Sequence, residues 1–158
     1  EQERAVHYAP RVLGYRARSA DELRRQLQRK GFTPPAADYA LQRLHQLGLL
    51  DDREFARSWV TSRVTRGPMR LRYELRQKGI APEIAEESIL SFRSVDDDLA
   101  TAWRLARKAW RGDGPARDPA ALRKVWQMLQ RRGFTREVIA QVCARLGAAV
   151  DAEGDWLD

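Results

Sequence analysis

A short segment that occurs three times constrains the fold of this chain more than any other feature. The copies are residues 23–32, 71–80 and 125–134. Each has apolar residues eight and four positions before a glycine, a cation directly before that glycine, and an apolar residue after it. Apolar residues four apart lie on one face of a helix, and glycine past a helix end adopts the left-handed conformation that closes the helix. Each copy therefore predicts a short amphipathic helix that ends abruptly.

A second apolar pattern follows each glycine at a constant spacing. The residues five, six, ten and thirteen positions later are apolar in all copies: Ala36, Ala37, Leu41 and Leu44, then Ile84, Ala85, Ile89 and Phe92, then Val138, Ile139, Cys143 and Leu146. The pattern predicts a second amphipathic helix that buries these positions, and three aligned matches indicate an internal repeat of roughly 45–55 residues. No segment alternates convincingly with the period of a strand. We therefore predict an all-α fold of nine helices, in three tandem three-helix repeats that stack into an elongated, curved array.

Helix start and stop signals divide this chain into its expected repeats. Residues 19–22 form a capping box, Gly48 ends one helix, and Asp51 caps the next. The expected domains are residues 1–50, 51–93 and 94–147. Residues 112–115 are expected to be a flexible loop. Residues 148–158 are expected to be a disordered acidic tail, because they are acidic and show little periodicity. In the middle repeat, a first helix would bury a stripe of four residues, Phe55, Trp59, Val60 and Val64.

Composition points to binding rather than catalysis. The net charge of +7, with 32% charged residues, favours an anionic partner. A single cysteine, Cys143, leaves no disulfide framework or thiolate metal cluster, and His7 and His45 lack other ligands at metal-binding spacing. The sequence has no phosphate-binding glycine loop and no nucleophile elbow. It also has no membrane-spanning run and no signal-peptide pattern. We expect a cytoplasmic protein that is not an enzyme and holds no metal or cofactor.

Cations gather in the middle of the chain and give the candidate site. Residues 53–80 contain eight cations against two acids, Glu54 and Glu74, a local balance of +6. A long basic strip suits a row of phosphates or acidic groups on a polymer, although a solvated face explains any single arginine equally well. The candidate binding residues are Arg63, Arg66, Arg70, Arg72, Arg76 and Lys78, extended by Arg24, Arg25, Arg29, Lys30, Arg131 and Arg132.

Residues 48–80 resemble the RecX family of bacterial recombinase regulators. The matching residues are Gly48, Leu50, Asp51, Asp52, Phe55, Ala56, Val60, Arg63, Gly67, Arg70, Leu71, Glu74, Leu75, Lys78, Gly79 and Ile80. The first repeat resembles the family through Arg18, Ser19, Glu22, Leu23, Leu27, Lys30, Gly31 and Phe32, and the third through Arg132, Gly133 and Phe134. The chain departs from the family at Leu49, where the family usually has an aromatic residue.

The resemblance implies a non-enzymatic regulator of the RecA recombinase, such as a RecA inhibitor or modulator, with a role in DNA repair, recombination and the SOS response. Such a protein would bind the RecA–DNA filament and restrain filament growth, ATP hydrolysis and strand exchange. We expect a monomer that binds bare single- and double-stranded DNA more weakly, and in a salt-dependent way. The alternative is a sequence-reading DNA-binding protein, because short three-helix modules can present a recognition helix to the major groove. An enzyme using Asp51 and Asp52 is a third and weaker reading, since capping already explains Asp51.

Overall fold

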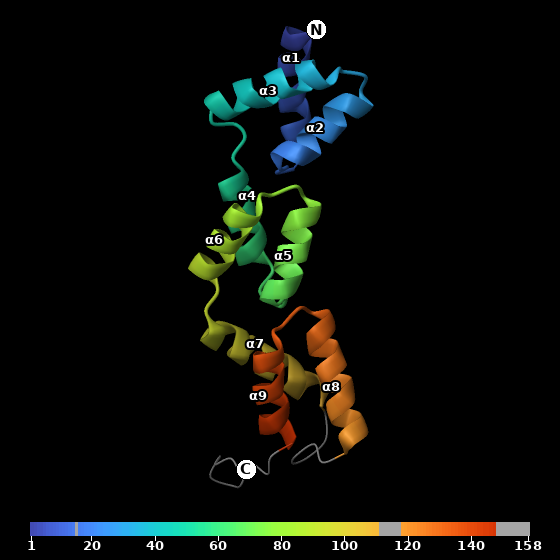
Figure 1. Ribbon diagram of the computed structural model, residues 1–158, viewed down its shortest axis with the longest axis vertical. Helices are drawn as coiled ribbons and strands as arrows, with labels where there is room; N and C mark the ends of the chain where they lie inside the picture. The colour runs from blue at the N-terminus through green and yellow to red at the C-terminus, as the bar shows by residue number, and fades with distance from the viewer. Residues whose placement is uncertain (15, 111–117, 148–158) are drawn as a thin grey trace. The chain divides into compact units, whose positions relative to one another are not determined.

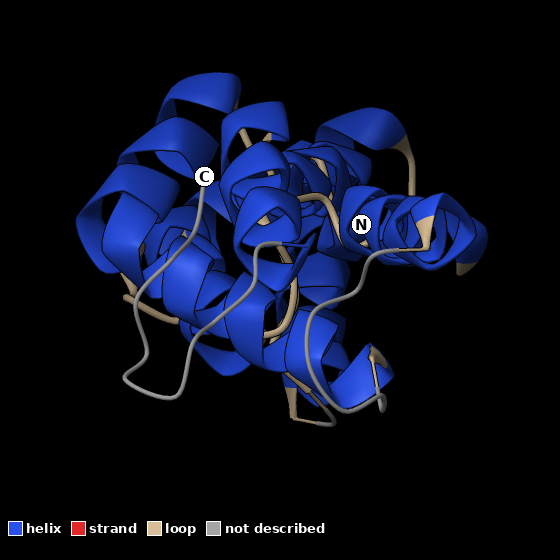
Figure 2. Ribbon diagram, turned by 90° about the horizontal axis from the view of Figure 1, so that it is seen from below, coloured by secondary structure: helices blue, strands red, loops and turns tan. Residues whose placement is uncertain are grey.

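The computed structural model describes residues 1–14, 16–110 and 118–147 (Figure 1). These residues form nine helices: α1 Gln2–Leu13, α2 Ala20–Arg29, α3 Pro34–Gln46, α4 Asp52–Ser62, α5 Pro68–Gln77, α6 Pro82–Phe92, α7 Val95–Ala109, α8 Pro119–Arg131 and α9 Arg136–Gly147. Figure 2 shows helices and loops but no strand in the described part of the chain. The all-α prediction is therefore confirmed. The predicted loop at 112–115 and the predicted tail at 148–158 lie outside the described residues.

The helices belong to two compact units. One comprises Glu1–Trp59 with Tyr73–Ser88, and the other comprises Val60–Arg72 with Ile89–Asp158. Three helices, α4, α5 and α6, contribute residues to both units. The predicted domain boundaries at residues 50, 93 and 147 stay a prediction.

The core of the first unit is built where α1 packs on α2 and α3, and α2 packs on α3. The repeated apolar positions supply most of it. Leu23 and Leu27 of α2 are fully buried, as are Ala37 and Leu44 of α3. Phe32, the apolar residue after the first repeat glycine, packs against the edge of this core together with Tyr8 of α1. The predicted register of the first repeat is therefore correct.

The second unit repeats this arrangement with α7, α8 and α9. These three helices pack on one another around Val125 and Leu129 of α8 and Val138, Ile139 and Leu146 of α9. Three tryptophans, Trp103, Trp110 and Trp126, are partly buried against this core. Each of the three rings therefore contributes apolar contacts to this core.

Local signals place the helix ends where they were expected. The Ser19 hydroxyl accepts from the Glu22 backbone N–H at 3.2 Å, and the Glu22 carboxylate accepts from the Ser19 N–H at 3.3 Å. The three repeat glycines, Gly31, Gly79 and Gly133, have φ angles of 93°, 75° and 87°. A residue with a Cβ rarely adopts such a conformation, so each glycine can end its helix where other residues would not.

Two residues predicted to be buried are exposed. Helix α4 ends at Ser62, and Val64 beyond it is 53% exposed. The Arg93 guanidinium donates to the carbonyls of Arg63 and Val64, at 3.5 and 3.4 Å. If α4 continued, backbone N–H groups of the helix would donate to these carbonyls instead. Phe92, the last residue of α6, is 43% exposed, whereas Ser88 one turn earlier is buried. Both predictions were wrong because the apolar pattern runs past the point where each helix stops packing.

Candidate nucleic-acid interface

Helix α5 presents a basic and aromatic face to solvent. Leu71 and Leu75 are fully buried. The opposite side carries Met69 and Tyr73, which are 56% and 62% exposed. Residues spaced three to four apart share a helix face. The exposed arginines Arg70 and Arg76 flank Tyr73 at this spacing, and the partly exposed Arg72 lies at the edge of the same face. This helix therefore offers several cations around one exposed ring.

The N-terminus of α5 lies against the turn between α8 and α9, within the second unit. The Gly67 N–H donates to the Arg132 carbonyl at 2.6 Å, and the Met69 N–H donates to the Gly133 carbonyl at 2.9 Å. The Arg70 guanidinium reaches the Arg131 carbonyl at 3.3 Å. Arg70, Arg131 and Arg132 therefore lie together, although 61 residues separate Arg70 from Arg131. We call these three residues the arginine cluster.

Two glycines allow this close approach. A Cβ added to Gly133 would overlap the backbone nitrogen and the Cβ of Arg70, and a Cβ added to Gly67 would overlap the backbone of Gly133. The repeat glycine of the third copy thus has two functions. It ends α8 in a left-handed conformation, and it lets the start of α5 touch the turn.

The electrostatics of the arginine cluster favour an anionic partner. No acidic side chain in the described part of the chain pairs with Arg131, Arg132 or nearby Arg136. Like charges held close together repel one another, and a phosphate or carboxylate between them relieves that repulsion. Arginine is well suited to this contact because its planar guanidinium binds phosphate through two parallel hydrogen bonds.

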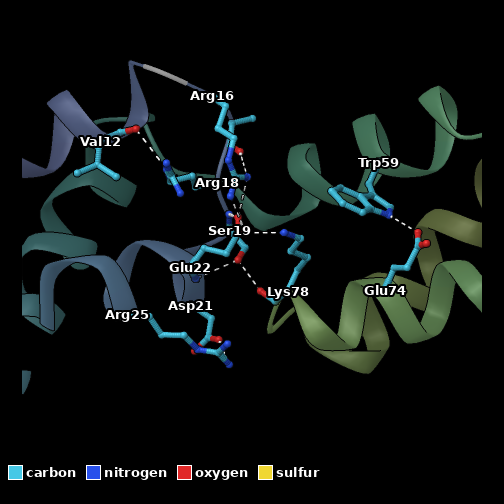
Figure 3. A network of polar contacts seen from close by, with 11 residues as sticks. Val12, Arg16, Arg18, Ser19, Asp21, Glu22, Arg25, Trp59, Glu74 and Lys78 are labelled. Atoms are coloured by element: carbon cyan, nitrogen blue, oxygen red, sulfur yellow. Dashed lines mark hydrogen bonds and ion pairs between the residues drawn. The ribbon is translucent and has the colours of Figure 1, made fainter. Parts of the chain in front are cut away.

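Lys78, another predicted site residue, lies in a different environment within the first unit (Figure 3). Its ammonium lies 2.6 Å from the Glu22 carboxylate, which also accepts from Arg16 at 3.0 Å. The Ser19 hydroxyl donates to the Lys78 carbonyl. The ammonium also lies 5.3 Å above the ring of Trp59, whose indole N–H donates to Glu74 at 2.9 Å. Lys78 thus joins the start of α2 to the end of α5.

This ion-pair network lowers the pKa of Glu22. Burial of the carboxylate works in the opposite direction, but hydrogen bonds from Arg16 and Lys78 and from the Ser19 N–H outweigh it. A carboxylate with a lowered pKa stabilises the fold when ionised, and loses that contribution as the pH falls through its folded pKa. The stability that ionised Glu22 contributes is therefore complete above the ordinary glutamate pKa of 4.5. It is lost progressively as the pH falls from there through the lower pKa of the folded state.

We expect Glu22→Gln to lower stability at neutral pH and to have progressively less effect as the pH falls below 4.5. Urea unfolding of both proteins across this range measures the difference. Glu83→Gln, which changes an exposed glutamate at the start of α6, is the matched control. If the loss of stability in Glu22→Gln does not change with pH, the charge of Glu22 contributes nothing beyond its capping hydrogen bond.

The predicted cations on α2 are partly neutralised by neighbouring acids. Arg24 pairs with Asp38 at 2.8 Å and Arg25 pairs with Asp21 at 2.6 Å. Exposed Arg29 donates to the Arg25 carbonyl at 3.4 Å, and Lys30 lies 5.8 Å above the Tyr8 ring. The remaining two predicted residues, Arg63 and Arg66, follow α4 and are partly exposed. The predicted strip is therefore not uniform: Arg24 and Arg25 are paired with acids, whereas Arg76 and Arg131 are exposed and Arg132 is partly exposed.

Sequence reasoning missed the acidic partners of two candidate residues. It identified Glu22 only as a capping residue, whereas Glu22 also binds Lys78 across 56 residues of sequence. It treated Arg24 as a free cation, although Asp38 lies on the next helix. Both pairs join different helices, so no local spacing could have revealed them.

Neither a metal centre nor a membrane helix appears in the described residues. No group of three or more His, Cys, Asp or Glu side chains there could hold a metal ion. No described helix is both long enough and apolar enough to cross a bilayer.

Comparison with known families gives a consistent result along the chain. Family models described as the first, second and third three-helix domains of RecX match residues 5–44, 51–89 and 96–143. The crystal structure of RecX from Lactobacillus salivarius has a TM-score of 0.78 and 21% identity, covering 92% of this chain and 96% of that one. A second crystal structure, of a regulatory protein RecX, has a TM-score of 0.79 and 25% identity, covering 89% and 72%.

Curated relatives extend the match to the sequence level. Regulatory protein RecX of Prosthecochloris aestuarii is 36% identical over 146 residues, which cover 90% of this chain and 93% of the relative. Regulatory protein RecX of Halorhodospira halophila is 38% identical over 138 residues, covering 86% and 84%. Domain matches, sequence identity and fold agree from the first repeat to the third, and this chain belongs to the RecX family of regulatory proteins.

Proposed function

We propose that this chain regulates a RecA recombinase by binding its nucleoprotein filament, and that it thereby restrains filament growth, ATP hydrolysis and strand exchange. Membership of the RecX family carries the proposal, and the arginine cluster supplies a surface suited to it. The regulation would act through binding and would need no catalytic step.

The physical basis is the match between a polymer of negative charge and cations held at fixed positions. Arg70 and Arg76 project from α5, while Arg131 and Arg132 end α8. Arginines that neutralise phosphates release condensed counterions, so binding to bare DNA should weaken as salt rises. A filament would add protein contacts, and we therefore expect it to be preferred over bare strands.

The test is a co-sedimentation experiment at physiological salt with recombinase filaments, bare single strands and bare duplexes. Preferential recovery with filaments, together with slowed strand exchange, supports the proposal. Selective binding to particular duplex sequences would instead support a base-reading DNA-binding protein, and would contradict the filament proposal.

Reversing the charge of Arg70, Arg72 and Arg76 to glutamate is expected to remove most filament binding and leave the fold intact. These side chains lie off the buried face of α5, so the changes open no cavity around Leu71 and Leu75. The loss would come from repulsion between the new carboxylates and the filament phosphates, and added salt should partly mask it. Filament co-sedimentation and strand-exchange assays measure the effect.

A control variant reverses three exposed cations outside the candidate set, Arg104, Arg123 and Lys124. Both triple variants should keep wild-type helical spectra and melting temperatures. Filament binding should survive in the control variant. If the α5 variant is folded and still restrains strand exchange at wild-type concentrations, the exposed face of α5 is not the contact surface.

A further inference from the structure

A pocket beside the arginine cluster is unused by the function proposed so far. It has a volume of about 490 Å³ and is lined by Met69, Trp126, Gln130, Phe134, Arg136 and Ile139, all in the second unit. We call it the Trp126 pocket. Its volume lies within the range of small-ligand sites, and its walls combine apolar and aromatic surface with two polar side chains.

The surroundings of the Trp126 pocket are strongly basic. Met69 precedes Arg70 in the chain, and Gln130 precedes Arg131 and Arg132, so the arginine cluster is adjacent in sequence to two of the lining residues. Arg136 adds a fourth cation from the first turn of α9. A single described acid, Glu137, follows in that turn. The pocket therefore combines aromatic side chains with Arg136 in its lining, and the arginine cluster adjoins two of the lining residues along the chain.

We propose that the Trp126 pocket holds one unstacked base of single-stranded DNA while the arginine cluster binds the phosphates on either side of it. The base would stack on the indole of Trp126, and the side-chain amide of Gln130 offers a donor and an acceptor to the base edge. Met69 is 56% exposed and its unbranched side chain can adjust to the ring that enters.

Charge complementarity selects a nucleotide over an apolar protein side chain. A leucine or phenylalanine from a partner would use the apolar wall alone, and would leave Arg136 and the Gln130 amide without a role. A nucleotide joins a flat ring to an anionic phosphate, which suits a pocket lined by the indole of Trp126 and the guanidinium of Arg136. A base in a duplex is already stacked and paired, so the site favours single strands.

This inference deepens the proposed function, since both use the arginine cluster, but it can be tested without a recombinase. The probes are a labelled oligothymidylate and an abasic strand of the same length, which carries the same phosphates and no bases. We expect the wild-type chain to bind the base-bearing strand about tenfold more tightly than the abasic strand, measured by fluorescence anisotropy. Trp126→Leu should remove that preference and leave binding to the abasic strand unchanged.

Two controls keep the outcome interpretable. Trp103→Leu changes another partly buried tryptophan of the same core and should keep the preference for bases. In the unaltered protein, a strand containing 5-iodouracil should cross-link to Trp126 or Met69, as located by mass spectrometry, so the test does not depend on a variant folding.

Equal affinity of the wild-type chain for base-bearing and abasic strands would overturn the base-binding site. Cross-links confined to residues outside the Trp126 pocket would overturn it as well. Either result can occur while filament binding and restrained strand exchange persist. In that case the proposed function stands without the base-binding site. If Trp126→Leu then weakens only filament binding, the pocket receives a recombinase side chain instead of a base.

Discussion

Replacing Asp98 with alanine is expected to lower the free energy of unfolding by about 3–5 kcal/mol. Asp98 and Arg93 form an ion pair of 2.7 Å whose side chains are only 8% and 7% exposed. Arg93 also reaches the carbonyls that follow α4, so its guanidinium is held in place after the carboxylate is removed. Alanine would leave a buried cation without its counter-charge, which is among the most costly single changes in a protein. Denaturant unfolding followed by the helical spectrum measures the loss.

The control is Asp96→Ala, which removes an exposed acid from the same first turn of α7. It should cost only about 0.3–1 kcal/mol, the contribution of an acid at a helix start. The double variant Arg93→Met with Asp98→Leu should recover much of the lost stability, since apolar residues of similar size often replace a buried pair without loss. If Asp98→Ala costs no more than Asp96→Ala, the buried pair contributes nothing to stability beyond the effect of an acid at a helix start.

Gly133→Ala should destabilise the chain by about 2–5 kcal/mol, for two separate reasons. A left-handed conformation costs an alanine roughly 1–2 kcal/mol. The added methyl group would also overlap the backbone of Arg70, and such overpacking typically costs about 1–3 kcal/mol more. Because Arg70 cannot move without disturbing the start of α5, the DNA binding proposed for the arginine cluster should weaken as well. Thermal unfolding and strand-binding assays on the same variant measure both effects.

Gly31 provides a matched comparison at the equivalent repeat position. Its φ of 93° is close to the 87° of Gly133, but a Cβ there would meet no described atom within 4 Å. Gly31→Ala should therefore show only the conformational cost, about 1–2 kcal/mol. Equal losses for the two variants would mean that the contact between α5 and the turn contributes nothing to stability.

The fold was predictable from the sequence because its signals are local. An apolar residue every three or four positions predicts a helix, and a capping box or a glycine marks its end within one turn. The capping box at residues 19–22 and the left-handed conformation of Gly79 could both be predicted without reference to distant parts of the chain. The errors at Val64 and Phe92 occurred where a helix ends for tertiary reasons, such as the binding of Arg93 to the carbonyls beyond α4.

The candidate site was less predictable, because charge in a sequence does not reveal which cations are neutralised. Lys78 and Arg76 are both cations of the basic segment 53–80, and the sequence does not distinguish them. In the structure Lys78 forms an ion pair with Glu22, whereas Arg76 is exposed. The approach of Arg70 to Arg131 spans 61 residues and depends on two glycines that tolerate close backbone contact. Trp126 packs on the core of the second unit and lines a pocket together with Arg136 of the next helix, an arrangement that had no local signal.

The sequence by itself determined that this chain is all-α and repeated three times, since helix periodicity, caps and repeat glycines act over a few residues. It also showed the family resemblance and the basic character. Only the tertiary structure decided that a Cβ would meet no described atom at Gly31 but would overlap Arg70 at Gly133. It also decided that Lys78 is paired with Glu22, whereas Arg131 lies against Arg70. The physical reason is distance along the chain: helices form from neighbouring residues, whereas charge neutralisation and close backbone contact depend on residues that meet only in the folded protein.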